Sequence, residues 1–345
     1  MAKIAVLGAG SWGSALSIVL SDNGHDVRLW THRKSQADTI NNEHKNTQYL
    51  DVTLPSTLKA YHSLNEAVEG VSAVLIVVPT KAIRDVCKQL NQLVSDDLTI
   101  IHASKGIEPE TLMRVSEMIA QEMDGYEKEE IVVLSGPSHA EEVAKRQPTT
   151  VTVSSFDNEQ ACIAQDFFIN ESFRVYTSPD MIGIELGGAL KNIIALGAGI
   201  SDGLGYGDNA KAALITRGLA EIVRLGSSLG ANPLTFLGLP GVGDLIVTCT
   251  SVHSRNWRAG NLLGKGNNLD EVLDQMGMVV EGVRTVKAAH SFANSQKVEM
   301  PITTGIYQIL FEEKEPKAVV EQLMNRSKRE EMDGLSNLLS SRYLS

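Results

Sequence analysis

Cysteine is scarce in this chain of 345 residues, and its scarcity excludes two kinds of structure. The three cysteines, at positions 87, 162 and 249, lie far apart in the sequence and form no pair with metal-ligand spacing. An odd number at wide spacing is equally unlike a disulfide framework. We therefore expect a reducing, cytoplasmic compartment and thiols that serve as buried apolar groups.

Positive charge is also scarce, because the chain has 31 lysines and arginines but 42 aspartates and glutamates. The formal net charge of −11 argues against general binding to nucleic acids or anionic membranes. Phosphate-bearing ligands would therefore need local cations and helix N-termini. The opening apolar run, Lys3–Leu7, ends at a glycine turn and is too short for a signal peptide, and no repeat or low-complexity tract follows.

Two domains are expected from the length and from a change of pattern near residue 180. Before it, short branched-aliphatic runs alternate with amphipathic stretches, at 3–7, 26–30, 72–78, 98–102, 131–134, 149–153 and 173–177. This alternation predicts an α/β, Rossmann-type and mainly parallel sheet, with room for antiparallel strands at its far edge. The rest is helical almost throughout. We therefore predict a dinucleotide-binding domain over 1–178 and an all-α substrate and catalytic domain over 179–345, with ligands at the carboxyl ends of the strands.

A glycine-rich turn follows the first predicted strand directly. The residues Gly8-Ala-Gly10-Ser11-Trp12-Gly13 lead into a helical stretch that ends before the second predicted strand. The first glycine allows a tight turn, the second admits a pyrophosphate, and the third lets helix and strand pack closely. The helix N-terminus offers its N–H groups to phosphates. Strand, turn and helix in this order predict nucleotide binding, whereas the glycines alone would fit a plain βα turn.

The end of the second predicted strand lacks a carboxylate. An acidic residue there usually binds a free ribose 2′-hydroxyl, but this chain has Thr31-His32-Arg33-Lys34. Two cations and a histidine suit a 2′-phosphate, so we prefer NADP(H) as the cofactor and keep NAD(H) as possible. The same residues would also fit a solvated basic turn that binds nothing.

One lysine interrupts the most apolar part of the chain. Between residues 182 and 200 only Glu185, Lys191 and Asn192 are neither apolar nor glycine, and that pattern favours a soluble core helix over membrane insertion. A buried ammonium needs a partner or a lowered pKa. Small neighbours one helical turn away, such as Gly187 and Ala195, would leave a hollow for a ligand. They would equally suit close helix packing, with the lysine reaching out to solvent.

Further polar residues lie where predicted strands end or helices begin. Lys105 and Ser138 follow two of the strands, and Asp244 precedes an apolar run. The set Ser254-Arg255-Asn256 offers donors suited to phosphate. Each also has an interpretation without a ligand. Lys105 would be a solvated surface charge, Asp244 a helix N-cap, and Arg255 and Asn256 part of an exposed loop. Glu281 would by the same reasoning be a helix-surface acid.

Together these motifs resemble those of the NAD(P)-dependent sn-glycerol-3-phosphate dehydrogenases, and most closely their bacterial cytoplasmic branch. The resemblance covers essentially the whole chain, in the same order. It is carried by Gly8-Ala-Gly-Ser-Trp12-Gly, Ser104-Lys105-Gly106, Ser135-Gly136-Pro-Ser138-His-Ala140, Gly188-Ala-Leu-Lys191-Asn192-Ile-Ile-Ala-Leu-Gly-Ala-Gly199 and Gly243-Asp244-Leu. No single motif is decisive, but their combination is specific.

The resemblance implies roles for individual residues. Cofactor contacts fall to Ser11, Trp12, His32, Arg33, Lys105, Ala140, Arg255, Val279 and Glu281, beside the turn glycines Gly8, Gly10 and Gly13. Substrate contacts fall to Lys105, Gly136, Ser138, Lys191, Asn192, Asp244, Thr248, Ser254, Arg255 and Asn256, of which Asn192 and Thr248 match positions in more distant eukaryotic relatives. Lys191 matches the proton acceptor, and we expect Lys105 and Asp244 to be catalytic with it. A homodimer and a small phosphorylated substrate are implied as well.

The implied reaction interconverts sn-glycerol 3-phosphate and dihydroxyacetone phosphate and supplies glycerol 3-phosphate for phospholipid synthesis. Oxidising a secondary alcohol needs a hydride acceptor, a base for the hydroxyl proton and donors for the developing oxyanion. We expect neutral Lys191 to take that proton, its pKa lowered from about 10.4 by Lys105 and apolar surroundings. Asp244 would oppose this shift of the pKa and fix the direction of the side chain.

Other functions stay open on the residues alone. A related two-domain dehydrogenase for a 3-hydroxy acid or a ketopantoate-type substrate also places a lysine on its helical domain, but it needs a carboxylate clamp. A non-catalytic nucleotide sensor would retain residues 8–33 without needing Lys191 and Arg255. Within the dehydrogenase interpretation, His102 or His139 would be the base in an alternative mechanism, although structural roles suit both histidines better.

Overall fold

The computed structural model describes residues 1–94, 98–328, 330 and 331, which divide into two compact units. The first unit comprises Met1–Lys105 and Val115–Met181, and the second comprises Gly106–Arg114 and Ile182–Ser345. The last part of the predicted helical domain, 332–345, lies outside the described residues. The assignment of the segment Gly106–Arg114 to the second unit is a feature that the sequence did not indicate.

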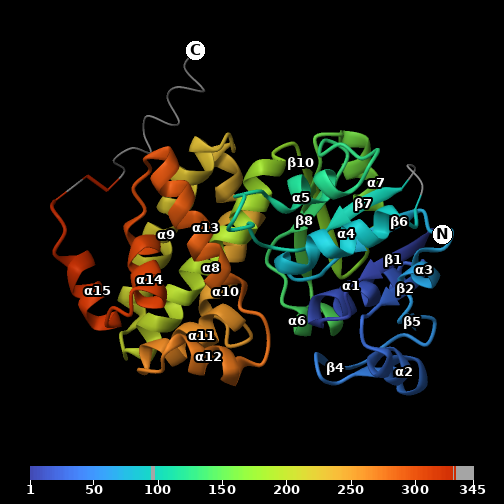
Figure 1. Ribbon diagram of the computed structural model, residues 1–345, viewed down its shortest axis with the longest axis horizontal. Coiled ribbons are helices and arrows are strands. Elements are labelled where there is room, and N and C mark those ends of the chain that lie inside the picture. The colour runs from blue at the N-terminus through green and yellow to red at the C-terminus, as the bar shows by residue number, and fades with distance from the viewer. Residues whose placement is uncertain (95–97, 329, 332–345) are drawn as a thin grey trace, which may run out of the picture. The chain divides into compact units, whose positions relative to one another are not determined.

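An eight-stranded sheet forms the first unit, in the order β10-β9-β8-β7-β6-β1-β2-β5 (Figure 1). Its strands are β1 (Lys3–Leu7), β2 (Asp26–Trp30), β5 (Lys59–Tyr61), β6 (Ala73–Ile76), β7 (Thr99–His102), β8 (Val132–Ser135), β9 (Thr149–Ser154) and β10 (Phe173–Ser178). All neighbours pair in parallel except β8 and β9, which are antiparallel. The predicted mainly parallel sheet with a reversed far edge is therefore confirmed.

The strand order reverses between β1 and β6, and this reversal defines where a ligand binds in such a sheet. From β1 the chain passes through α1 (Ser11–Asp22) to β2 on one side, and from β6 through α4 (Ile83–Asn91) to β7 on the other. Because such crossovers are right-handed, the two helices cover opposite faces. A crevice results at the carboxyl ends of β1 and β6, the usual place of a dinucleotide.

The remaining elements of the first unit are short. They are α2 (Lys34–Glu43), the hairpin β3 (Lys45–Asn46) and β4 (Leu50–Thr53), α3 (Leu64–Val68), η1 (Thr80–Ala82), α5 (Val115–Glu122), α6 (Ala140–Ala144) and α7 (Asn158–Phe168). The sequence did not predict β5 or the hairpin, because β5 has three residues and the strands of the hairpin have two and four. Runs this short carry too little periodicity to distinguish a strand from a loop.

Helices make up the second unit, as predicted. They are α8 (Met181–Gly203), α9 (Asp208–Ser228), α10 (Asp244–Thr250), α11 (Arg255–Gly264), α12 (Leu269–Met276), α13 (Glu281–Gln296), α14 (Pro301–Phe311) and α15 (Pro316–Met324), with the short turns η2 (Pro233–Leu237) and η3 (Leu239–Gly243). The apolar residues of α8 lie in the largest cluster of buried side chains in this unit. Helix α8 is long and apolar enough to cross a membrane, but 89% of its apolar window is buried in protein, so it is a core helix.

Glycines let α8 and α11 cross at backbone contact distance. A Cβ atom at Gly199 would lie 2.0 Å from the carbonyl oxygen of Trp257, and one at Gly260 would lie 2.0 Å from that of Leu196. The same holds at Gly203 and Gly264. A Cβ atom at Gly203 would lie 2.4 Å from Asn261 O, and one at Gly264 would lie 2.4 Å from Ile200 O. Because neither helix has a side chain at these points, the crossing brings the start of α11 against the middle of α8. That arrangement places Asn256 of α11 within hydrogen-bond distance of Asn192 of α8.

Candidate active site

The glycine turn after β1 has the geometry that a pyrophosphate requires. Gly8 has a φ of 121°, and a Cβ atom there would lie 2.6 Å from Val77 O, just after β6. A Cβ atom at Gly13 would lie 1.9 Å from Gly8 O, so this glycine sets the contact between helix and turn. At Gly10 no atom lies within 4 Å of the Cβ position. The backbone is therefore open at the point where a phosphate would approach the N-terminus of α1.

Two further features of the first unit fit a bound dinucleotide. The indole N–H of Trp12, in the first turn of α1, is buried and makes no hydrogen bond within the described residues. A buried donor of this kind costs free energy unless a ligand or water accepts from it. After β2, His32 and Arg33 are exposed, and within the described part of the chain the Arg33 guanidinium makes only a long 3.3 Å side-chain hydrogen bond, to Gln48. These side chains are free to meet an anionic group on a ribose.

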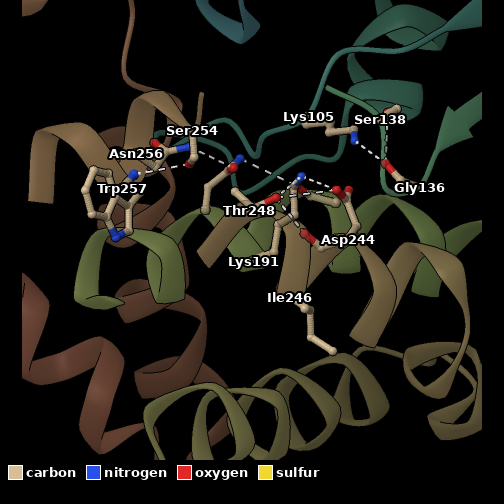
Figure 2. A network of polar contacts seen from close by, with 12 residues as sticks. Lys105, Gly136, Ser138, Lys191, Asp244, Ile246, Thr248, Ser254, Asn256 and Trp257 are labelled. Atoms are coloured by element: carbon tan, nitrogen blue, oxygen red, sulfur yellow. Dashed lines mark hydrogen bonds and ion pairs between the residues drawn. The ribbon is translucent and has the colours of Figure 1, made fainter. Parts of the chain in front are cut away.

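Lys105, Gly136 and Ser138 meet at the ends of β7 and β8 (Figure 2). The Lys105 ammonium donates to Gly136 O at 3.2 Å, and the Ser138 hydroxyl donates to the same oxygen at 2.9 Å. Gly136 has a φ of 145°, and a Cβ atom there would lie 3.0 Å from Val151 Cα. Glycine is therefore required at this position, and its carbonyl holds the lysine and the serine together.

Lys191 lies in the middle of α8 and is buried rather than reaching out to solvent. Its side chain is 8% exposed, and its Nζ donates to Asp244 Oδ1 at 2.5 Å and to Thr248 Oγ1 at 2.8 Å (Figure 2). Asp244 and Thr248 are one turn apart on α10 and face α8 together. The alternative of a lysine that extends to the surface is therefore wrong. A buried ammonium with a buried carboxylate partner is the arrangement that desolvation demands.

The two partners of Lys191 are themselves buried and in contact with each other. Asp244 is fully buried, and the hydroxyl of Thr248 donates to the Asp244 carbonyl at 2.6 Å, so its lone pair is directed at the lysine. Burial and the nearby Asp244 charge raise the pKa of the Cys249 thiol to about 12, which excludes this neighbour as a base or nucleophile near neutral pH. Asp244 begins α10, but the N-cap is Gly243, so its side chain serves Lys191 and not the helix end.

The hollow expected beside Lys191 is absent at Gly187. A Cβ atom at Gly187 would lie 2.5 Å from Pro240 O, so this glycine admits the backbone of η3 and not a ligand. The prediction from small neighbours was therefore wrong for Gly187, because the sequence could not show what packs against it. The close-packing alternative is correct at that position.

The start of α11 presents groups that can bind an anion. Ser254 is the N-cap and accepts from Trp257 N at 3.2 Å, and Arg255 follows with an exposed side chain. Asn256 is buried, and its amide donates to Asn192 Oδ1 at 2.8 Å while it accepts from Gly282 N at 2.9 Å. These two bonds fix the orientation of the amide and leave its second N–H bond available. An Arg side chain, an oriented amide and a helix N-terminus together suit a phosphate.

The predicted residues thus form several groups. Within the second unit the structure brings together Lys191, Asn192, Asp244, Thr248, Ser254 and Asn256, and within the first it brings together Lys105, Gly136 and Ser138. Ala140 begins α6, two residues after Ser138. Val279 lies two residues before α13, and Glu281 is the first residue of that helix. Among the alternative bases, His102 is fully buried within β7, whereas His139 is the N-cap of α6.

Sequence reasoning missed Gly282. A Cβ atom there would lie 2.7 Å from Asn256 Oδ1 and 2.8 Å from Asn192 O, so α13 begins against the amide pair only because this residue has no side chain. Nothing in the sequence separates Gly282 from other glycines. The crossing glycines of α8 and α11, by contrast, have a visible signal, since each helix has two glycines four residues apart.

Comparisons with known proteins agree with this geometry. Residues 3–161 match the model of the NAD-dependent glycerol-3-phosphate dehydrogenase N-terminus, and residues 180–321 match that of its C-terminus. The chain is 73% identical over 343 residues to the glycerol-3-phosphate dehydrogenase (NAD(P)+) of Oceanobacillus iheyensis, covering 99% of each chain. It is 61% identical to the enzyme of that name from Bacillus pumilus, again over 99% of each. A crystal structure of glycerol-3-phosphate dehydrogenase from Coxiella burnetii superposes with a TM-score of 0.89 at 40% identity, covering 94% of this chain and 99% of that one.

Proposed function

The chain belongs to the NAD-dependent glycerol-3-phosphate dehydrogenase family, and from this we propose that it reduces dihydroxyacetone phosphate to sn-glycerol 3-phosphate with NADP(H) as the preferred cofactor. It is an NAD(P)-dependent oxidoreductase of that family. The 3-hydroxy-acid and ketopantoate alternatives are thereby set aside. The observation that carries the mechanism is the burial of Lys191 between Asp244 and Thr248.

We propose that Lys191 moves the proton of the reacting oxygen. In the neutral amine the contacts to Asp244 and Thr248 use two N–H bonds and leave the lone pair to accept the hydroxyl proton during oxidation. In reduction the ammonium returns that proton to the carbonyl oxygen. Asp244 balances the charge of the ammonium and holds its direction, which a buried and flexible lysine needs. The bound nicotinamide supplies or accepts the hydride.

The phosphate of the substrate is assigned to the start of α11. Arg255 is the exposed cation, and Asn256 is the amide whose orientation Asn192 and Gly282 fix. Binding energy gained at the phosphate orients the carbon that reacts, although it lies two bonds beyond the ester oxygen. On the strength of the motif resemblance, Lys105 is assigned to both substrate and cofactor, and Gly136 and Ser138 are assigned to the substrate. This division gives the phosphate and the reacting oxygen separate partners.

Most residues assigned to the cofactor lie in the first unit, and Arg255, Val279 and Glu281 lie in the second. The open backbone at Gly10, the buried Trp12 N–H and the exposed Arg33 all fit a dinucleotide, with Ser11 and His32 beside them and Ala140, Val279 and Glu281 as further contacts. We propose a 2′-phosphate as the partner of Arg33.

The physiological role that we propose follows from an NADPH-linked reduction. It is the supply of glycerol phosphate for phospholipid synthesis in the cytoplasm. We also propose a homodimer, which the exposed apolar side chains Leu234, Leu237, Ile246 and Val252 support.

The direct test is the oxidation of NADPH by the purified protein with dihydroxyacetone phosphate, repeated with NADH. We expect oxidation that depends on the phosphorylated substrate and is faster with NADPH at equal, subsaturating concentrations. Unphosphorylated dihydroxyacetone is the control, since it lacks the group assigned to Arg255 and Asn256. Protein that binds NADPH but leaves it unoxidised with this substrate would contradict the proposed reaction.

Replacing Arg33 with glutamine tests the cofactor preference. A charge-assisted hydrogen bond to a phosphate is worth about 1.5–3 kcal/mol, so kcat/KM for NADPH should fall about 10- to 100-fold. With NADH, which has no 2′-phosphate, we expect little change. Lys59→Gln, on an exposed residue of β5 in the same unit that is assigned to no ligand, is the matched control for the loss of a charge. Equal losses with both cofactors would show that Arg33 does not recognise the 2′-phosphate.

A further inference from the structure

The segment directly after Lys105 forms a tight loop within the helical unit. Gly106–Arg114 belongs to the second unit, although the chain on both sides of it belongs to the first. Ile107 pairs with Arg114 in an antiparallel bridge, and the Glu108 N–H donates to Met113 O at 3.0 Å. Leu112 has a φ of 63°, a conformation that leucine adopts only where its surroundings hold it. The loop therefore has one defined shape.

Two kinds of contact hold this loop in the helical unit. Ile107 is 1% exposed and belongs to the core cluster of that unit, against which Leu112 also packs. Arg114 Nη1 donates to Glu185 Oε2 on α8 at 2.5 Å, and the two side chains are only 10% and 3% exposed. Glu110, at the exposed tip, lies 4.0 Å from Arg284 on α13. The ion pair is thus a buried polar attachment of the loop to α8.

Lys105 itself is held from the other side by the sheet. The preceding Ser104 donates its hydroxyl hydrogen to Val78 O at 2.7 Å, and the Lys105 ammonium donates to Gly136 O at 3.2 Å. On the carboxyl side, the next residues are those of the loop. The direction of the chain at Lys105 is therefore set by Ser104 before it and by the attachment of the loop after it.

We propose that Arg114 and Glu185 are a positioning pair that sets the place of Lys105, and this inference rests on the proposed function, in which Lys105 contacts substrate and cofactor. Glu185 is one of three residues in the apolar part of α8 that are neither apolar nor glycine, and the other two, Lys191 and Asn192, belong to the proposed site. Glu185 has no part in the proton or phosphate chemistry. Burying a carboxylate costs free energy, and the ion pair with Arg114 offsets part of that cost while it attaches the loop to α8.

The first measurement does not depend on turnover. The acetylation rate of each lysine by trace acetic anhydride is read by peptide mass spectrometry in wild type, Glu185→Gln and Glu299→Gln, with the exposed Lys145 as the internal reference. Glu299 pairs with Arg326 at 3.3 Å on the surface of the same unit and is the matched control. We expect the relative rate at Lys105 to rise several-fold in Glu185→Gln and to stay unchanged in Glu299→Gln. An unchanged rate in folded Glu185→Gln overturns the proposal.

The second measurement is a double-mutant cycle with Lys105→Ala. Displacing a contact residue by about 1 Å can cost about 10²-fold, so kcat/KM for dihydroxyacetone phosphate should fall by about tenfold or more in Glu185→Gln. In the Lys105→Ala background the same change should cost less than about twofold, because the residue through which it acts is gone. A purely structural role would reduce activity equally in both backgrounds and would contradict the proposal.

A conservative variant guards against a failure to fold. Arg114→Lys keeps the buried charge but loses the planar fork of the guanidinium, so we expect a smaller rise in Lys105 acetylation than in Glu185→Gln. It replaces Glu185→Gln in both measurements if that variant does not melt cooperatively. If the wild type does not turn over dihydroxyacetone phosphate, the proposed function fails, while the acetylation rates still decide whether Arg114 and Glu185 position Lys105.

Discussion

Replacing Lys191 with alanine should remove almost all turnover and leave the affinity for NADPH close to that of the wild type. A positioned general acid or base contributes about 10²–10⁴-fold, so we expect kcat to fall about 10³-fold. Lys191 itself is not assigned to the cofactor, and most residues that are, among them the turn glycines and Arg33, belong to the first unit, whereas Lys191 belongs to the second. Single-turnover kinetics and NADPH fluorescence titration measure the two quantities separately.

The interpretation of that variant requires a control for stability. Alanine at 191 leaves Asp244 buried without its 2.5 Å partner, and an uncompensated buried charge costs about 3–5 kcal/mol. Lys191→Ala combined with Asp244→Asn removes both charges and should regain most of that stability without regaining turnover. A double variant with restored turnover would show that Lys191 supports the fold and not the chemistry.

Lys211 provides the matched control for the loss of a lysine. Its Nζ lies 2.8 Å from Asp202 Oδ2, so it is also paired with an aspartate in the helical unit, but it is 22% exposed and has no part in the proposed site. Lys211→Ala should keep kcat within about twofold of the wild type, since partly exposed pairs contribute little. Small primary amines should partly restore turnover in Lys191→Ala, because they can occupy the space vacated by the lysine side chain. Loss of turnover in Lys211→Ala equal to that in Lys191→Ala would contradict the assignment.

The sequence predicted the fold correctly where the pattern that encodes an element lies within one continuous segment. Each predicted strand from 3–7 to 173–177 corresponds to an observed strand, because the central strands are continuous apolar runs and the edge strands, such as β10, alternate apolar with polar residues. The glycine turn was recognised for a similar reason, since its strand, turn and helix follow one another in the chain. The helical character of the second unit follows equally from the pattern after residue 180.

The sequence was insufficient wherever a partner lies far away in the chain. Lys191 could be singled out as unusual, but neither composition nor periodicity shows that Asp244, 53 residues later, is the partner of its ammonium. The pairing of Arg114 with Glu185 spans 71 residues and leaves no trace in either segment. Gly187 looked like the wall of a hollow, yet Pro240 fills the space. Such contacts arise from tertiary packing, which local patterns do not encode.

Replacing Gly260 with alanine should destabilise the helical unit more than almost any other single methyl group added to it. Alanine is the better helix former by about 1 kcal/mol, so propensity alone predicts a gain. The added Cβ, however, would lie 2.0 Å from Leu196 O and 3.0 Å from Ile200 N, and both are backbone atoms of a buried helix. They cannot move without separating α8 from α11. We expect a net loss of more than about 3 kcal/mol in the free energy of unfolding, measured by urea titration.

Gly197→Ala is the matched control for this prediction. It also adds a methyl group to a helix interior, here that of α8, but the nearest atoms to the new Cβ are Ile306 Cδ1 at 3.0 Å and Leu214 Cδ2 at 3.3 Å, which are the terminal methyl groups of longer side chains and not backbone atoms. We expect a change within about 1 kcal/mol. Gly260→Ala should also raise the KM for dihydroxyacetone phosphate, because Asn256 rides on α11 and its partner Asn192 on α8. If both variants change stability equally, the close crossing of α8 and α11 does not explain the loss of stability, and an unchanged KM in Gly260→Ala would show that the crossing does not hold the proposed phosphate site in place.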